Sequence, residues 1–435
     1  MKTRQFFGMA LMMIVLPMGI GAYAQQTLQL NQVVVASGGA FSDPDDYVTV
    51  SSLNPVTLVQ QNFATIYTQA VQDILVDGLD LFVAATDSLM MYNLDTYERL
   101  DAIALSGLSQ LYTAGDYVFV SIQYPETSGF LRVFKRNSLV MLSEVEGITD
   151  ESAGMVAFAD KLYVAVPGSW TSTRGKLAVV DLNSHQLIEE IDLGELSTGI
   201  HSLFVYENNV IAVCRTPWGV EQGVITVYNT EDKTVAHNVF DNVFGKGIAV
   251  FGNTLYLFVD NGIGAIDLLT FEMLDPAVIE DPGSASFIYF ADAAFDHLNQ
   301  QFFATTSDYF SFGQGHVFGQ EGVETGLFEA GISPEAIGLD YRDVTGIEQS
   351  KQVYSLILSP NPASNMIRFE TGRKIGPFDA IVYSLHGQLM QKHQGYSDAI
   401  DISSLPNGYY ILTISTPEGM TSMASFVKLS QANER

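Results

Sequence analysis

The sequence contains a single cysteine, Cys214, and few basic residues. One cysteine cannot form a disulfide bond within the chain, so burial of a large apolar core must supply the stability. The 20 Lys and Arg stand against 49 Asp and Glu, which gives a formal net charge of −29. Such a chain repels nucleic-acid phosphates and anionic lipid headgroups at long range, so we expect no nucleic-acid partner. Solvated acidic loops are the simplest explanation of the negative charge. The alternative explanation is a functional one, in which the charge attracts a cation or a cationic ligand.

Long apolar runs are lacking after residue 24, so we expect no transmembrane segment. Before that point, Lys2 and Arg4 precede an apolar stretch at 6–20 and a small-residue pattern that ends at Ala24. This order is typical of a secretory signal peptide, here residues 1–24. The stretch contains Pro17 and is shorter than the roughly 20 residues that span a bilayer, which argues against a membrane anchor. No cysteine stands at the junction, so a lipoprotein signal is not expected.

Catalytic and metal-binding motifs are lacking too. The chain has no HExxH, GxSxG, CxxC or phosphate-cradling loop, so we assign no catalytic residue and leave metal and cofactor unknown. The acidic run with Asp43, Asp45 and Asp46 lacks the glycine and final glutamate of an EF-hand loop, which favours a solvated turn over a calcium site. Cys214 lies in an apolar run and is expected to be a buried hydrophobe. His201 is expected to face the central tunnel of the ring-shaped fold inferred below. A structural hydrogen bond is favoured over a ligand role for its side chain.

What the chain does contain is a repeat. A polar residue followed by an aromatic or β-branched run recurs seven times, and the middle positions are 37 to 48 residues apart. A four-stranded propeller blade takes roughly 40–45 residues, so the period indicates seven blades. The copies lie at 32–35, 80–83, 117–120, 161–164, 209–212, 254–257 and 301–303.

Other strands of each blade can be placed around these copies. A hairpin pattern follows the first six copies, and the seventh hairpin, around 316–328, looks degraded. An inner strand precedes each copy except the first, and a matching segment at 333–341 follows the seventh. We expect this late strand to complete the first blade, because a closed ring leaves no exposed sheet edge. An open β-solenoid is the competing architecture. The inner strands are expected at 71–76, 109–113, 154–159, 200–206, 247–251 and 286–290.

The last eighty or so residues form a separate module. Short β-rich runs separated by turn residues predict a small Ig-like β-sandwich at 353–435, after a linker at 343–352. The acidic excess lies entirely before Val353. The fold class is therefore all-β, a seven-bladed β-propeller at 25–342 followed by the sandwich. The strands of the sandwich are expected at 367–369, 380–383, 399–402, 409–414 and 424–429.

The tail resembles a known family in several motifs that occur in order. SPNPAS at 359–364, VYSLHGQLM at 382–390, IDISSLPNGYYILTI at 400–414 and FVKL at 426–429 are similar to the type A sorting domain of the type IX secretion system. This resemblance implies that the outer-membrane translocon recognises the tail and usually removes it. The cargo would then be released or attached to surface lipopolysaccharide, so the protein would be secreted or on the cell surface after periplasmic transit. An Ig-like domain that merely binds a partner is the alternative.

The body resembles a second family. VVVASGGAF at 33–41, VVDLNSHQL at 179–187 and GIHSLFVYENNVIAV at 199–213 are similar to surface-layer or quinoprotein-like seven-bladed propellers, nearest to exported Bacteroidota propellers, one branch of which captures cobalamin. The characterised capture proteins are lipoproteins, whereas this chain has no lipidation cysteine and carries the sorting tail. Cobalamin as the ligand therefore does not follow from the resemblance.

Four loops that follow the repeated strands predict a binding rim. Both tryptophans of the chain lie in them, with further aromatic and basic side chains suited to stacking on a planar ligand or sugar ring. The function expected is non-catalytic binding of a small-molecule, glycan or protein ligand. An extracellular metal-dependent hydrolase or lyase and a structural or adhesion module are the alternatives. For the aromatic rings themselves, the alternative role is to cap the hydrophobic ends of neighbouring blades. The candidate ligand-binding residues are Tyr124, Trp170, Arg174, Arg215, Trp218 and Tyr309.

Overall fold

The computed structural model describes residues 27–40, 42–344, 356–371, 378–384, 389–396, 399–415 and 421–429. The contacts divide the chain into two compact units, one at Leu28–Asp343 and the other containing the residues from Val344 onward. The described residues form β-strands, with two short 3-10 helices, η1 (Glu195–Ser197) and η2 (Ser284–Ser286). None of the helices found there is long and apolar enough to cross a membrane. The predicted signal peptide and most of the predicted linker lie outside the described residues.

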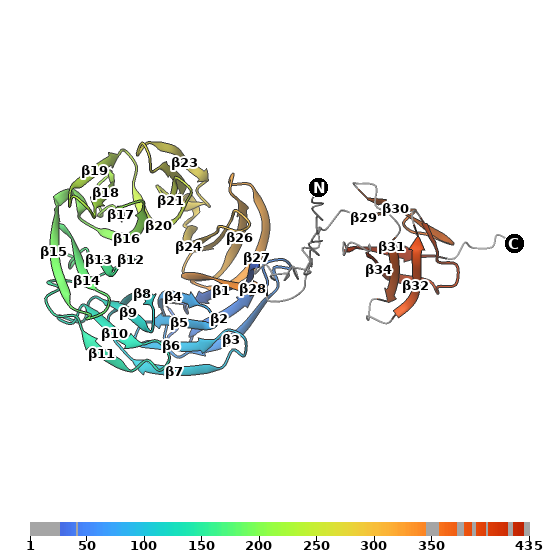
Figure 1. Ribbon diagram of the computed structural model, residues 1–435, viewed down its shortest axis with the longest axis horizontal. Helices are drawn as coiled ribbons and strands as arrows, with labels where there is room; N and C mark the ends of the chain where they lie inside the picture. The colour runs from blue at the N-terminus through green and yellow to red at the C-terminus, as the bar shows by residue number, and fades with distance from the viewer. Residues whose placement is uncertain are drawn as a thin grey trace, which may run out of the picture. The chain divides into compact units, whose positions relative to one another are not determined.

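Seven four-stranded antiparallel sheets make up the described part of the first unit, and Figure 1 shows them arranged in a ring. The innermost strands are β28 (Ala336–Val344), β4 (Val71–Asp77), β8 (Leu108–Ala114), β12 (Met155–Phe158), β16 (Ile200–Tyr206), β20 (Phe244–Phe251) and β24 (Tyr289–Asp296). The second strands are β1 (Thr27–Ser37), β5 (Asp80–Ala85), β9 (Tyr117–Ile122), β13 (Lys161–Val166), β17 (Asn209–Cys214), β21 (Thr254–Val259) and β25 (Gln301–Ser307).

Two further strands complete each sheet on its outer side. The third strands are β2 (Val48–Leu53), β6 (Ser88–Asn93), β10 (Leu131–Lys135), β14 (Gly175–Asp181), β18 (Gly223–Asn229), β22 (Gly262–Asp267) and β26 (Phe312–Gly319). The outermost strands are β3 (Gln60–Ile66), β7 (Arg99–Ala104), β11 (Met141–Glu144), β15 (Leu187–Gly194), β19 (Val235–Phe240), β23 (Met273–Ile279) and β27 (Glu324–Ile332).

The second strands explain the apolar repeat of the sequence. Val33, Val34 and Val35 of β1 are 0% exposed, as is Phe82 of β5. Consecutive residues of a strand point to opposite faces, so a run of buried residues means that both faces of the strand are covered. Clusters of buried apolar side chains lie between each sheet and the next around the ring, the last joining the β24–β27 sheet to the β1–β3 sheet.

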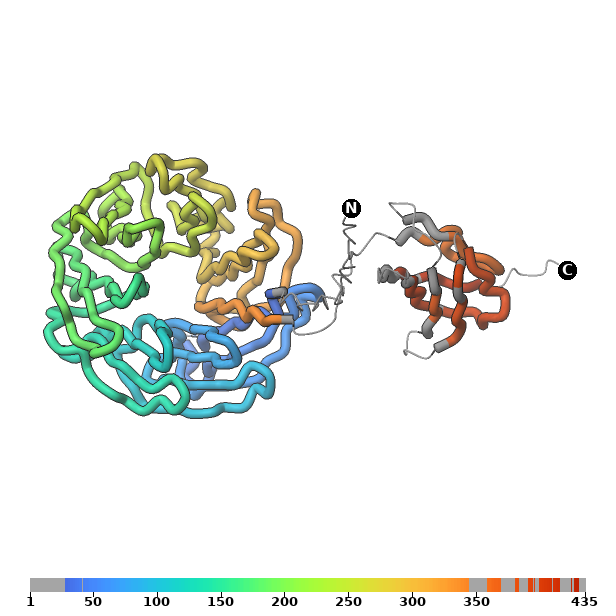
Figure 2. The backbone as a smooth tube through the Cα atoms, in the orientation of Figure 1, coloured from blue at the N-terminus to red at the C-terminus, as the bar shows by residue number. Residues whose placement is uncertain are grey.

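A strand from the end of the first unit completes the first sheet, as the sequence predicts. β28 lies beside β1, in the order β28-β1-β2-β3. The Glu335 N–H donates to the Ala36 carbonyl at 3.0 Å, and the Gly38 N–H donates to the Ser333 carbonyl at 2.7 Å. Figure 2 shows the orange segment next to the blue one at this point. The pairing leaves β1 with a neighbour on both sides.

Two predictions about the seventh sheet are wrong. Its inner strand is Tyr289–Asp296 rather than 286–290, because the chain first makes η2 at Ser284–Ser286. The Asp281 carboxylate accepts the N–H groups of Gly283 and Ser284 and favours that turn. The hairpin at 316–328 is not degraded: β26 and β27 pair antiparallel from the pair Phe312 with Ile332 to the pair Phe318 with Glu324, with two register shifts.

The second unit contains two sheets with one core. The first has the order β29-β30-β33, and the second has the order β32-β31-β34-β35. Ile367 and Ile400 of the first sheet are buried together with Val382 and Leu412 of the second, which makes the two sheets the layers of a sandwich. The sequence did not indicate β29 or β32. The strands are β29 (Leu356–Ser359), β30 (Met366–Thr371), β31 (Phe378–Ser384), β32 (Leu389–Tyr396), β33 (Ala399–Asp401), β34 (Gly408–Ser415) and β35 (Thr421–Lys428).

Candidate functional site

A cavity of about 750 Å³ lies among the innermost strands of the ring. Strands β4, β8, β16, β20, β24 and β28 contribute to its wall, together with residues that directly follow four of the second strands. Its volume lies within the roughly 300–1,000 Å³ that small-molecule sites commonly have. The residues that follow the second strands and reach it are Gln123, Arg215, Asp260, Asn261 and Tyr309.

Bulges in the inner strands turn polar residues towards this cavity. In β4 and β16, Gln72 and His201 are extra residues without a partner in the neighbouring strand. In β8 and β20 the pairing also skips residues, among them Gln110 and Lys246. All four line the cavity. A bulge changes the direction of side chains and bends its strand. The bulges in these four inner strands therefore give the central cavity a polar wall.

A lysine and two aspartates lie together in the cavity. Lys246 Nζ is 2.5 Å from Asp292 Oδ1, and the Asp292 side chain is only 8% exposed. Asp292 Oδ2 accepts the Ile337 N–H at 2.8 Å, and Asp73 Oδ2 accepts the Leu111 N–H at 2.8 Å. Burial raises the pKa of Asp73 to about 7, while the Leu111 N–H and Lys246 act against this rise. At neutral pH, Asp73 is therefore divided between its protonated and ionised forms.

His201 is a neutral member of the wall. Burial, followed by the charges of Arg215 and Lys246, lowers the pKa of His201 to about 3. The side-chain amide of Gln110 lies 3.1 and 3.3 Å from its two ring nitrogens. His201 thus has the structural hydrogen bond that the sequence favoured, and it also lines the cavity. Burial is the main cause of this lowered pKa, and the charges of the two cations add to it.

Two of the six predicted ligand-binding residues, Arg215 and Tyr309, line the cavity together. Arg215 follows β17 and has no ion pair within the described part of the chain. Tyr309 has a φ of 64°, in the left-handed region that is uncommon for a tyrosine. Its N–H donates to Ser307 Oγ at 2.8 Å, and Asp308 Oδ1 accepts the next N–H, from Phe310. These bonds hold the tyrosine at the cavity in a conformation that costs backbone energy.

Three other predicted residues lie on exposed loops. Trp170 is 95% exposed, Trp218 is 97% exposed and Tyr124 is 81% exposed. None of them lines the central cavity. Their exposure contradicts the alternative that these rings cap the ends of neighbouring blades. They remain available for a partner at the surface.

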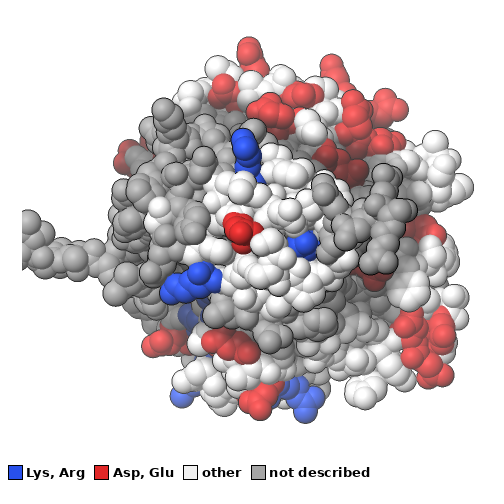
Figure 3. Space-filling model, turned by 90° about the vertical axis from the view of Figure 1, so that its right-hand side faces the viewer, with Lys and Arg blue, Asp and Glu red and all other residues white. Residues whose placement is uncertain are grey.

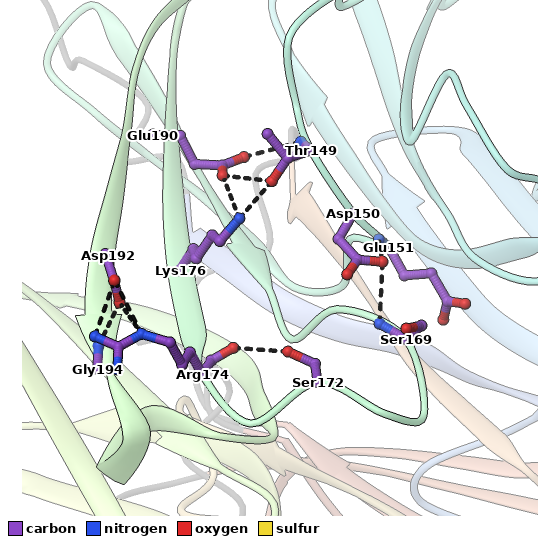
Figure 4. A network of polar contacts seen from close by, with 10 residues as sticks. All are labelled: Thr149, Asp150, Glu151, Ser169, Ser172, Arg174, Lys176, Glu190, Asp192 and Gly194. Atoms are coloured by element: carbon purple, nitrogen blue, oxygen red, sulfur yellow. Dashed lines mark hydrogen bonds and ion pairs between the residues drawn. The ribbon is translucent and has the colours of Figure 1, made fainter.

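Arg174 is already engaged within its own sheet. Its guanidinium contacts the Asp192 carboxylate, with Nη2 2.9 Å from Oδ2, and lies 3.6 Å from Glu195. Figure 4 shows the Arg174 side chain directed at Asp192, next to a second group in which Glu190 accepts from Lys176 and Thr149. The hydrogen bond and charge of Asp192 raise the pKa of Arg174.

Other candidate residues have structural surroundings. Asp46 Oδ2 accepts the Ala40 N–H and Asp43 Oδ1 accepts the Asp45 N–H, so the acidic run forms a turn. Cys214 is 2% exposed, and burial raises the pKa of its thiol to about 12, as befits a buried hydrophobe. Among the described residues, no three His, Cys, Asp or Glu side chains are placed to hold a metal ion.

The sequence prediction missed the residues that supply most of the charge in the cavity, Lys246, Asp73 and Asp292. Each of them interrupts an apolar inner strand, but the sequence does not show that the bulged strands bring these residues to one cavity. His201 was noticed in its inner strand, but the others were not. The acidic surplus of the chain lies elsewhere, and Figure 3 shows Asp and Glu side chains gathered in dense groups on the visible surface.

Comparison with protein families identifies the tail. Residues 358–428 match the secretion system C-terminal sorting domain. This agrees with the motifs at SPNPAS and beyond, and it means that the protein is secreted or displayed on the cell surface by a type IX secretion system. A search of curated proteins gave no match.

Solved structures similar to the chain are β-propellers. The extracellular domain of a putative hybrid two-component system from Bacteroides thetaiotaomicron is 12% identical with a TM-score of 0.52, covering 93% of this chain and 59% of that one. A quinoprotein alcohol dehydrogenase-like protein from the same organism is 13% identical with a TM-score of 0.51, covering 71% of this chain and 78% of that one. At such low identity the likeness shows the fold alone: the body is a β-propeller.

Proposed function

We propose that this protein is an exported, non-catalytic binding protein that holds a small polar ligand with an anionic group in its central cavity. In this proposal the seven sheets are the seven blades of the propeller, residues 25–342, and the tail from 353 is an Ig-like sandwich that serves export. Signal-peptide cleavage after Ala24 and a linker at 343–352 complete the proposed organisation.

The unpaired guanidinium of Arg215 at the cavity is the observation that carries the proposal. Arg215 lines the cavity with an exposed side chain and forms no ion pair within the described residues, so its donors are free to meet a ligand. Its planar donors suit a carboxylate or phosphate group. Lys246, which is paired with Asp292, and the phenol of Tyr309 offer further polar contacts.

The carboxylates of the cavity support binding over catalysis. Asp73 and Asp292 each accept a backbone N–H from the next sheet of the ring. Each carboxylate therefore has a structural role, because it joins two neighbouring sheets. A ligand larger than the cavity would reach the surrounding loops, where Tyr124, Trp170 and Trp218 offer exposed rings. Arg174 would contact such a ligand while still paired with Asp192.

The test is a thermal-shift screen of the purified chain against a panel of organic carboxylates and phosphates. A ligand at 100 times its Kd stabilises the folded state by about 2.7 kcal/mol, so binding raises the melting temperature. For the best ligand of the panel, Arg215→Gln should weaken binding about tenfold or more, because a charge-assisted bidentate contact is lost. Arg99→Gln removes an arginine on outermost strand β7 and serves as the matched control.

Two outcomes would count against the proposal. Either no anion of the panel stabilises the protein, or Arg215→Gln binds as tightly as Arg99→Gln. The same protein separates the alternatives, since a metal-dependent hydrolase or lyase would retain stoichiometric metal and lose turnover to a chelator. An adhesion module would bind no small ligand in the panel.

A further inference from the structure

A second hollow, of about 660 Å³, lies at the seam between the first and seventh sheets. We call it the seam groove. β2 and β3 supply one wall, and β26 and β27 supply the other, in the part of the ring where Figure 1 shows these sheets side by side. Its lining residues are different from those of the central cavity.

Amide side chains give this groove its chemistry. Asn62 Oδ1 accepts from Ser51 Oγ at 2.7 Å, and Gln314 Nε2 donates to the Phe328 carbonyl at 2.6 Å. These bonds fix both amides, and in the described part of the chain the Asn62 amide nitrogen and the Gln314 amide oxygen have no protein partner. The groove therefore presents one oriented donor and one oriented acceptor.

A third amide, that of Gln60, carries an unsatisfied buried atom. Gln60 Oε1 is shielded from solvent and accepts no hydrogen bond within the described residues. Buried polar atoms without partners are rare in folded proteins, and each calls for a specific cause. Gln60 lines the groove, so a rotation of its side-chain amide would bring this oxygen to a donor group of a bound ligand.

Aromatic rings border the same groove. Phe312 lines it and is 81% exposed, although an isolated phenyl ring gains nothing from contact with water. Tyr47 also lines it, with its ring edge-on to Tyr67 at a centroid distance of 5.1 Å. A flat apolar ring beside oriented amides matches a ligand whose faces are C–H and whose edges are hydroxyl groups.

The charge of the groove narrows the ligand further. Its lining contains two carboxylates, Asp46 and Glu329, and no Lys, Arg or His. A negatively charged ligand would be repelled here, whereas the central cavity holds Arg215 and Lys246 as well as its carboxylates. We propose that the seam groove is a carbohydrate-binding site for neutral or amino sugars, separate from the ligand of the central cavity.

The experiment uses the whole purified chain on an array of oligosaccharides that contains neutral hexose, N-acetylhexosamine and amino-sugar chains, with uronate and sulfated chains beside them. Binding should be confined to the uncharged and amino-sugar chains. Phe312→Ala should weaken it about tenfold, because stacking on the ring is lost. Gln60→Ala should also weaken binding, provided that its thermal unfolding matches that of the parent chain.

The matched control is Phe310→Ala, which removes a phenylalanine that is 67% exposed two residues before β26 but does not line the groove. Arg215→Gln should leave sugar binding unchanged, which keeps this proposal distinct from the one for the central cavity. The proposal is overturned if no sugar of the array binds, if the acidic chains bind best, or if Phe312→Ala and Phe310→Ala bind equally well.

Discussion

Polar residues around the central cavity also join the sheets to one another. Ser202 Oγ accepts the Gly247 N–H at 3.0 Å, and Glu335 Oε2 accepts the Val71 N–H at 3.0 Å. Asp73 and Asp292 make the same kind of bond to the next inner strand. Buried polar atoms need such partners, so the wall that faces a ligand is also a rigid part of the frame.

Asp73 gives this frame a pH dependence. The unfolded chain ionises this carboxyl near 3.8, whereas the folded chain keeps its proton up to about 7. Between these values the folded state binds more protons, so stability falls as pH rises through the window. Asp73→Asn lacks this loss, and its stability relative to the parent chain should rise by more than about 1 kcal/mol between pH 4 and pH 8. Urea unfolding at a series of pH values measures the difference.

Asp308→Asn is the control for this measurement. Hydrogen bonds from Ser311 and from the Phe310 N–H lower the pKa of Asp308 to about 2. Its contribution is full above the unfolded value and is lost only as pH falls through about 2. The difference curve of Asp308→Asn should therefore be flat between pH 5 and pH 8, and an equally flat curve for Asp73→Asn would refute the assignment.

At the scale of strands, the sequence predicted what depends on local pattern. The buried second strands are recognisable as apolar runs, because each is covered on both faces. The closing strand at 333–341 follows from counting the inner strands, since the first copy has none before it. The inner strand Tyr289–Asp296 was misplaced, because residues 286–290 are as apolar as a strand and the turn set by Asp281 was not recognised.

The candidate site was only partly predictable for a related reason. Arg215 and Tyr309 could be placed at one rim because each follows a second strand. Lys246 could not, since a bulge turns it towards the cavity and no local residue pattern specifies that register shift. Whether the Trp218 ring packs against a neighbouring sheet or is exposed depends on the path of the loop after β17. Contacts with residues distant in the sequence determine that path.

The Lys246–Asp292 pair links strand β20 to strand β24 and makes a prediction at this scale. Asp292→Ala removes an almost fully buried carboxylate together with its bond to the Ile337 N–H. Hydrogen bonds to charged groups contribute about 1.5–3 kcal/mol, so we expect a loss of about 2 kcal/mol in the free energy of unfolding. Denaturant unfolding measures it.

Glu189→Ala is the matched control for that loss. It breaks the pair with Lys233, in which the two side chains are 38% and 59% exposed. Exposed pairs contribute little, so its cost should stay below about 1 kcal/mol. Equal losses of unfolding free energy in the two variants would show that the Lys246–Asp292 pair stabilises the fold no more than an exposed ion pair does.

For the whole molecule, ring closure and export place different demands on the chain after Ile332. The propeller needs β28, since the β24–β27 sheet and the β1–β3 sheet bury Phe303, Val33 and Ile337 in one cluster. Export needs the sorting domain at 358–428. The closing strand and the sorting domain follow each other in the sequence but belong to separate compact units. Truncation between them therefore tests each requirement by itself.

A chain of residues 25–352 keeps β28, whereas a chain of residues 25–333 loses it. Without β28, strand β1 becomes an exposed edge, and its residues Val33, Val34 and Val35 are 0% exposed in the closed ring. Open apolar edges pair with other chains, so the shorter protein should aggregate or melt without cooperativity, while the longer one melts in a single sharp transition. Size-exclusion chromatography and thermal circular dichroism report both properties. A monomeric 25–333 chain with the melting temperature of 25–352 would mean that the ring does not depend on its closing strand.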